Sequence, residues 1–210
     1  MVKSALMMVD LQKDFCPGGS LAAPEGDLII PIANALASRF ELVVASLDWH
    51  PSNHASFASN HPNHKVGDVI MINNIPQVLW PNHCVQDSPG SGLHPDLLLQ
   101  AIDHYVYKGV DAHIDSYSVF FDNHHLRSTG LNEYLRAKEI TTIYLLGLVT
   151  DYCVKYSALD ARNLGFEVFV IVDACRGVEV NPGDVAKAYQ EMQAAGVKLI
   201  YSRDVLTTNQ

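Results

Sequence analysis

The sequence has no apolar run long enough to cross a membrane, and its first residues, MVKSALMMVDLQKDF, lack the pattern of a signal peptide. It also has no cluster of Lys and Arg, because 14 basic residues are outnumbered by 23 acidic ones, which gives a formal net charge of −9. We therefore expect neither a membrane partner nor a nucleic-acid partner.

Cysteine is scarce and widely spaced. The four cysteines, Cys16, Cys84, Cys153 and Cys175, match no zinc-ribbon or C-x-x-C pattern. Without an export signal, we expect them to be reduced thiols in a cytoplasmic protein. The chain also lacks internal repeats, low-complexity tracts and Pro/Gly/Ser linkers, so residues 1–210 are expected to form a single domain.

Short apolar segments recur along the chain and predict buried strands. They are rich in Val, Ile, Leu or Tyr, and most do not alternate with polar residues. Such runs are typical of strands that are buried on both faces, as in parallel sheets. The six segments are residues 5–10, 41–48, 104–109, 141–148, 167–174 and 197–202.

Helical patterns lie between most of these segments, at 24–40, 130–140, 154–165 and 181–196. In the last of them we expect Asn181 to be the N-cap and Gly196 to end the helix. The alternation of strands and helices predicts an α/β protein, with three α/β/α layers around a central, mostly parallel six-stranded sheet. The first helix is expected to present one apolar face, formed by Leu28, Ile32, Ala35, Leu36 and Phe40.

Polar residues stand where several predicted strands end. In an open parallel sheet, ligands bind outside the carboxyl ends of the strands. The polar residues at these ends therefore indicate an enzyme. They are Asp10, Asp48, Lys108, the corner at 150–153 and Asp173.

Cys153 lies at a predicted turn between a strand and a helix. A thiol becomes a nucleophile as its thiolate, which nearby cations and helix N-termini favour. Lys108 could supply the positive charge, and Asp10 could accept the thiol proton and pass it to a leaving group. Each residue alone also has a structural explanation, as a packed thiol, a solvated lysine or a helix cap. Their shared position at one edge favours catalysis.

A connection at about 48–95 is much longer than ordinary loops and is rich in His, Asn and Pro, which indicates a functional loop. Asp48 and His50 are two residues apart, so their side chains project to the same side of an extended segment. His83 could return as a third ligand. One carboxylate and two imidazoles suit a divalent ion, Zn²⁺ first and Fe²⁺ or Mn²⁺ as alternatives. His54 is either a further ligand or a neighbour of the site.

Six motifs, in order along nearly the whole chain, resemble the nicotinamidases of the isochorismatase-like cysteine hydrolase superfamily. The block GLVTDYCV identifies only the superfamily, whereas the metal motif and WPNHCV make the resemblance to nicotinamidases much more specific. The motifs are VDLQKDFCPGGSL, DWHPSNHASF, WPNHCV, YKG, DSYSVFFD and GLVTDYCV.

The resemblance implies a catalytic triad of Asp10, Lys108 and Cys153. It also implies a cis peptide between Leu148 and Val149, and an oxyanion hole formed by the backbone N–H groups of Val149 and Cys153. The expected reaction is hydrolysis of nicotinamide to nicotinate and ammonia through a cysteine thioester, in NAD salvage, with pyrazinamide as a further candidate substrate.

The resemblance further implies how the substrate is held. A metal ion would bind the pyridine nitrogen and orient the ring. The aromatic residues Phe15, Trp80 and Tyr117 would form a wall around the ring. From sequence alone, each of the three could equally belong to the core.

Three other functions stay open. The first is another cysteine amidohydrolase of the superfamily, acting on a carbamoyl or ureido substrate, although such relatives generally lack the metal residues. The second is hydrolysis by metal-bound water, with Cys153 structural. The third is a thiol sensor without turnover. The partner is expected to be a small-molecule substrate, and the sequence leaves open whether the protein is a homo-oligomer.

Overall fold

The computed structural model describes residues 3–72 and 74–207. Its central sheet has six strands in the order β5-β2-β1-β6-β7-β8, and every neighbouring pair is parallel. The predicted fold class is confirmed, and each predicted apolar segment overlaps one strand. The strands are β1 Ser4–Val9, β2 Val43–Asp48, β5 His104–Lys108, β6 Thr142–Leu148, β7 Glu167–Arg176 and β8 Lys198–Ile200.

Side chains alternate between two core layers along the central strand β1. Ala5, Met7 and Val9 face one cluster of buried apolar residues, while Leu6 and Met8 face the other. This division follows from the two-residue period of a strand. Burial on both faces explains why the sequence of β1 does not alternate between apolar and polar residues.

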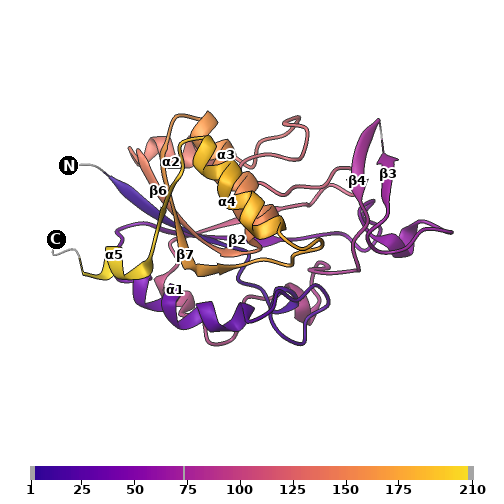
Figure 1. The fold of residues 1–210 in the computed structure, drawn as a ribbon, viewed down its shortest axis with the longest axis horizontal. Helices are drawn as coiled ribbons and strands as arrows, with labels where there is room; N and C mark the ends of the chain where they lie inside the picture. Colours follow the sequence, from indigo (N-terminus) through magenta and orange to yellow (C-terminus); the bar gives the residue numbers. More distant parts are fainter. Residues whose placement is uncertain (1–2, 73, 208–210) are drawn as a thin grey trace.

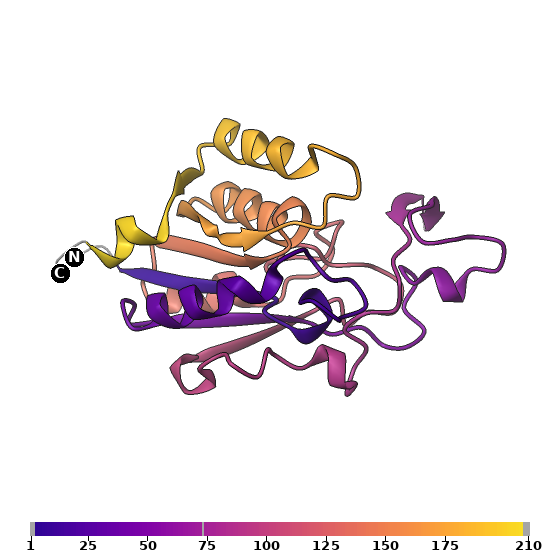
Figure 2. The same cartoon turned by 60° about the horizontal axis from the view of Figure 1, so that its bottom comes forward.

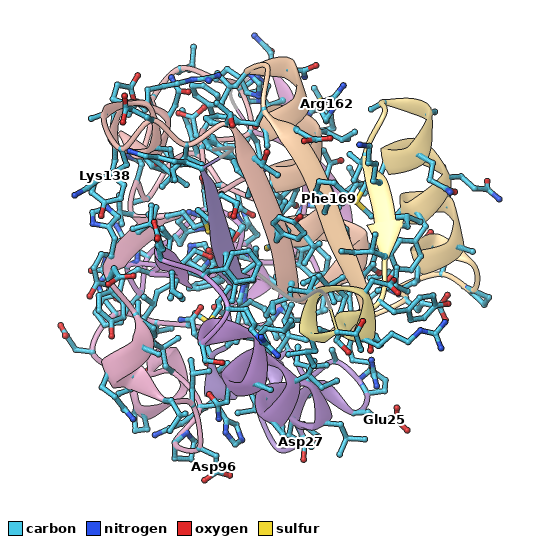
Figure 3. The ribbon with its side chains drawn as sticks, turned by 90° about the vertical axis from the view of Figure 1, so that its left-hand side faces the viewer. Glu25, Asp27, Asp96, Lys138, Arg162 and Phe169 are labelled. Carbon is cyan, nitrogen blue, oxygen red and sulfur yellow. The ribbon has the colours of Figure 1, made fainter. Side chains whose placement is uncertain are left out.

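Helices cover both faces of the sheet. Figure 1 places α2, α3 and α4 above the sheet and α1 below it, and Figure 3 shows the same layers from the end where Figure 1 places the termini. No helix within residues 3–72 and 74–207 is long and apolar enough to span a membrane. The helices are α1 Ile30–Ala37, α2 Leu131–Ala137, α3 Lys155–Asn163, α4 Asp184–Ala194 and α5 Ser202–Leu206.

Two details of the helix predictions are wrong. The buried face of α1 includes Ile30, Ala33 and Leu36, whereas Leu28 is 55% exposed. The segment begins with a 3-10 turn at Gly26–Ile29, and this turn changes the phase of the helical face. Helix α4 begins at Asp184 after Gly183, so Asn181 is not its N-cap.

The long connection carries a small antiparallel hairpin, β3 Val69–Ile72 and β4 Ile75–Val78, that was not predicted. Figures 1 and 2 both show this hairpin projecting from the end of the molecule opposite the two termini. The strands of the main sheet run toward that end. The connection therefore lies over the carboxyl edge of the sheet, where the candidate site is found.

Candidate active site

Asp10 follows β1 in a left-handed backbone conformation, with φ of 48°. Ser46 on the neighbouring strand holds the turn: its hydroxyl donates to Asp10 Oδ1 at 2.7 Å and accepts from the Asp10 backbone N–H at 3.1 Å. Left-handed backbone is uncommon outside glycine, although Asp tolerates it better than most residues. The turn directs a fully buried carboxylate across the edge of the sheet.

Lys108 is the centre of the buried polar cluster. Its Nζ lies 2.9 Å from Asp10 Oδ2, 2.8 Å from Asp48 Oδ1 and 3.4 Å from Cys153 Sγ. It also donates to the Ser116 carbonyl at 3.0 Å. The side chain is 1% exposed, so these partners compensate for the loss of hydration. The structure therefore brings together all three residues of the predicted triad.

Cys153 lies in a π-helical turn, Thr150–Val154, that connects β6 to α3. The predicted cis peptide between Leu148 and Val149 is present. Cys153 is 4% exposed, and both Cys153 and Val149 line a pocket above the sheet edge. Irregular turns of this kind occur frequently at functional sites, where they re-aim a side chain.

Burial and the neighbouring charges shift the pKa values of Cys153, Asp10 and Lys108. Burial raises the pKa of the Cys153 thiol well above its usual value, and the nearby Lys108 cation does not cancel this effect. Burial also raises the pKa of Asp10, against the influence of Lys108. Burial alone would lower the pKa of Lys108, but Asp10 and Asp48 outweigh it and raise that pKa well above the ordinary value. The free site therefore holds a thiol beside a carboxylate with increased basicity and a permanent cation.

Asp48 connects this triad to a second cluster. One oxygen of its carboxylate contacts Lys108, and the other lies 2.8 Å from His50 Nε2 and 3.3 Å from His83 Nε2. The ligand atoms of Asp48, His50 and His83 lie within 4.8 Å of one another, and all three residues are buried. These are the three residues that the sequence predicted as metal ligands.

The hydrogen bonds of the Nδ1 atoms of His50 and His83 indicate whether this cluster suits a metal ion. His50 Nδ1 lies 2.9 Å from the Gly109 carbonyl, and His83 Nδ1 lies 2.8 Å from the Pro81 carbonyl. A carbonyl can only accept, so each Nδ1 carries the proton. Both Nε2 atoms face the same Asp48 oxygen, so a cation placed between them could be bound by all three ligand atoms. This is the arrangement in which carbonyls orient metal-binding imidazoles.

The last residue of the YKG motif, Gly109, must be small because of its position against His50. Its φ is +66°, and a Cβ at this position would collide with the imidazole ring of His50. The glycine thus allows the backbone carbonyl to approach the ligand. Gln12 supports the same cluster from the other side, because its amide pairs with the backbone N–H and C=O of Asp48, each at 2.8 Å.

His54 lies beside the three predicted ligands, in a second group with His50 and Asp115. Its Nδ1 accepts the backbone N–H of Ser56 at 3.2 Å. Burial is the main cause that lowers the pKa of His54, to about 4, so the ring is neutral. A neutral ring that accepts at Nδ1 carries its proton on Nε2, and this buried nitrogen has no hydrogen-bond partner among the described residues.

A small pocket lies above these groups, next to Cys153, Asp48 and His83. Phe15, Trp80 and Tyr117, the three aromatic residues predicted to surround a substrate ring, line this pocket. Trp80 Nε1 donates to the Tyr117 hydroxyl at 3.2 Å. Tyr152, which was not predicted, completes the aromatic wall, with its ring centroid 4.9 Å from that of Trp80. The aromatic lining suits a flat ring.

Sequence reasoning missed several residues of the site, among them Gln12, Ser46, Asp115 and Tyr152. Two of them carry a local signal, because Ser46 is two residues before Asp48 on a strand and Tyr152 adjoins Cys153. Asp173, predicted at a strand end, belongs elsewhere: its carboxylate accepts from the Ser202 backbone N–H at 2.8 Å.

The other cysteines are free and buried, as the packing interpretation requires. Cys16 and Cys84 belong to the core layer that contains α1, and Cys175 belongs to the opposite layer. None of the three lines the pocket, which leaves Cys153 as the thiol of the site within the described residues 3–72 and 74–207.

A covered parallel sheet with a thiol, a lysine and a carboxylate at its strand ends defines a hydrolase of the three-layer α/β class. The chain belongs to the isochorismatase family, because the Isochorismatase domain matches residues 4–204. It is 50% identical over 199 residues to the nicotinamidase of Escherichia coli, covering 93% of each chain. A solved nicotinamidase and pyrazinamidase from Acinetobacter baumanii superposes with a TM-score of 0.95 at 46% identity, covering 98% of this chain and 99% of that one.

Two further solved relatives carry ligands. The yeast nicotinamidase bound to the inhibitor nicotinaldehyde is 31% identical, with a TM-score of 0.88, and covers 94% of this chain and 99% of its own. The pyrazinamidase of Pyrococcus horikoshii in complex with zinc is 36% identical, with a TM-score of 0.77, and covers 95% of this chain and 99% of its own.

Proposed function

We propose that this protein is a nicotinamidase, which hydrolyses nicotinamide to nicotinate and ammonia in NAD salvage and also accepts pyrazinamide. The observation that carries the proposal is the meeting of Cys153, Lys108 and Asp10 below a small aromatic pocket that Asp48 and His83 also line. The nicotinamidase and pyrazinamidase activities of the similar proteins support the same substrates.

The first stage forms a thioester. Asp10 takes the proton of the Cys153 thiol, and the sulfur attacks the carboxamide carbon while the carbonyl electron pair moves to oxygen. The backbone N–H groups of Val149 and Cys153 stabilise this oxyanion, an effect typically of a few kcal/mol. Asp10 then donates the proton to the amide nitrogen, the C–N bond breaks, and ammonia leaves.

The second stage releases the acid. Asp10, again a carboxylate, removes a proton from water, and the hydroxide oxygen attacks the thioester carbon. The C–S bond breaks, the sulfur recovers its proton from Asp10, and the carboxylic acid product ionises to nicotinate. Throughout, the Lys108 cation balances the charge on the carboxylate and the sulfur, since it contacts both.

Asp48, His50 and His83 would hold one divalent ion, Zn²⁺ first and Fe²⁺ or Mn²⁺ as alternatives. When bound, the ion supplies a Lewis-acid contact for the pyridine nitrogen. The predicted aromatic residues Phe15, Trp80 and Tyr117, together with Tyr152, would limit the rotation of the substrate ring, so that the carboxamide stays near the sulfur. The four free cysteines suit a reducing compartment, and we propose a cytoplasmic location.

The metal proposal predicts a thermal shift. Protein stripped with a chelator should gain about 2.7 kcal/mol of unfolding free energy when Zn²⁺ is added at a hundred times its Kd. For a chain of this size that corresponds to a Tm rise of roughly 5–10 °C. His83→Ala should lose the rise, while His64→Ala, on the exposed part of the loop, should keep it. Equal shifts in both variants would rule out His83 as a ligand.

The activity itself is tested by ammonia release. Metal-loaded protein is expected to release ammonia from nicotinamide and from pyrazinamide, and to produce one carboxylic acid per ammonia, as measured by a coupled assay and chromatography. Carbamoyl and ureido amides serve as comparison substrates, because they lack the aromatic ring that the pocket fits. If these amides were hydrolysed and nicotinamide were not, the protein would be another amidohydrolase of the family.

A further inference from the structure

Three consecutive side chains leave the π-helical turn in different directions. Cys153 contacts Lys108, and Tyr152 packs in the aromatic wall. Asp151 does neither, yet it is only 4% exposed. Its two oxygens accept backbone N–H groups from the segment that follows β7: Oδ1 from Val178 at 3.1 Å and Oδ2 from Glu179 at 2.8 Å.

The segment that Asp151 holds forms part of the pocket. Val178 lines the same cavity as Cys153 and Tyr152. The chain comes very close to the carboxylate here, since a Cβ at Gly177 would lie 2.9 Å from Asp151 Oδ1 and would also collide with Val185. Glu179 has a φ of 46°, so the backbone bends sharply into the two hydrogen bonds.

A second connection to this segment is weaker. Arg176, at the end of β7, forms an ion pair of 3.4 Å with Glu25, which lies four residues after the pocket residue Leu21. The Glu25 side chain is 66% exposed, and exposed ion pairs contribute little. The two hydrogen bonds to a buried carboxylate are stronger, because charge-assisted bonds gain from the low local dielectric.

We propose that Asp151 is a positioning residue that holds Val178 as the outer wall of the substrate pocket and so sets the affinity for the aromatic amide. The inference rests on the proposed function for the identity of the substrate. The π-helical turn then has two roles. It presents Cys153 to the substrate, and through Asp151 it holds Val178 against the pocket. A residue with only a structural role would stabilise the loop without altering substrate affinity.

The decisive variant is Asp151→Asn. An asparagine keeps one acceptor oxygen but turns an N–H₂ group toward the other backbone donor, so one hydrogen bond is lost and the segment loosens. KM for nicotinamide is expected to rise about tenfold, which is the loss of one such bond. The kcat should change less than about threefold, because Asp151 touches neither the sulfur nor Lys108. Alkylation of Cys153 by iodoacetamide, followed by mass spectrometry of its peptide, should become faster.

Asp173→Asn is the matched control. Asp173 also accepts two hydrogen bonds, from the backbone N–H and hydroxyl of Ser202, but it does not line the pocket. This variant is expected to lower Tm while KM and the alkylation rate stay unchanged. Gly177→Ala disturbs the same wall without changing the carboxylate, and it should reproduce the KM increase even if Asp151→Asn does not fold.

Two results would overturn the proposal: a lower Tm in Asp151→Asn with unchanged KM and unchanged alkylation, or a loss of kcat with KM unaffected. The alkylation measurement uses no substrate, so it also separates the two hypotheses. If the native protein released no ammonia from nicotinamide, the proposed function would fail. Faster alkylation in Asp151→Asn would still support the role of the wall, and an unchanged rate would exclude it.

Discussion

Replacing Cys153 with alanine is expected to lower kcat for ammonia release from nicotinamide by about 10⁴-fold or more. In triad enzymes, removing the nucleophile leaves only the small rate contributed by binding and by the oxyanion hole. Initial rates at saturating nicotinamide, with metal content matched to that of the native protein, measure this loss. Metal binding should persist, because Cys153 is not among the three ligand residues.

Cys175→Ala is the control for this experiment. Cys175 is as buried as Cys153, at 3% against 4% exposed, but it lies in β7 and does not line the pocket. Its loss should cost some stability through a small cavity and leave kcat within a few fold. If Cys153→Ala kept most of the activity while a chelator abolished it, the reaction would proceed through metal-bound water instead.

Replacing Lys108 with methionine is expected to have the second largest effect, on stability as well as on catalysis. Lys108 compensates two buried carboxylates, those of Asp10 and Asp48. Removing one partner of a buried ion pair typically costs 3–5 kcal/mol, because the other charge is left unpaired. We expect the free energy of unfolding in urea at pH 7 to fall by about this amount, and the kcat for nicotinamide to fall by about 10³-fold or more.

A double variant isolates the electrostatic cause. Adding Asp10→Asn to Lys108→Met removes one of the two unpaired carboxylates, so stability should recover by about 1–2 kcal/mol while activity stays absent. Lys155→Met is the matched single control, since its 3.1 Å ion pair with Glu191 lies away from the pocket. If the double variant were as unstable as the sum of the single changes, the cost would arise from packing.

The strands and the position of the site were predictable because parallel sheets leave clear marks in a sequence. Strands buried on both faces must be continuously apolar, and their carboxyl ends must meet at one edge. Polar residues at those ends, such as Asp10, Asp48 and Lys108, therefore indicated one site before any contact was known. The D-x-H spacing was informative because alternate side chains of an extended segment project to the same side, which brings Asp48 and His50 together.

Other parts of the molecule depend on contacts between distant segments. The face of α1 was misassigned because a 3-10 turn at Gly26–Ile29 precedes the helix, and this turn packs against Phe15 and Leu148. On the β1 side of Asp48, where the strand pairing has ended, the Gln12 side chain binds its backbone, and nothing in the local sequence of Gln12 indicates that. The hydrogen bonds of Asp151 reach a segment 27 residues further along the chain.

The sequence by itself determined the alternation of strands and helices, the thiol, the carboxylates and the imidazoles, because periodicity and residue chemistry are local properties. Only the tertiary structure decided which oxygen of Asp48 faces Lys108 and which faces the imidazoles. It alone placed Tyr152 in the aromatic wall and Val178 over the pocket. These features depend on angles and distances between chain segments, which are set by how two core layers pack on one twisted sheet.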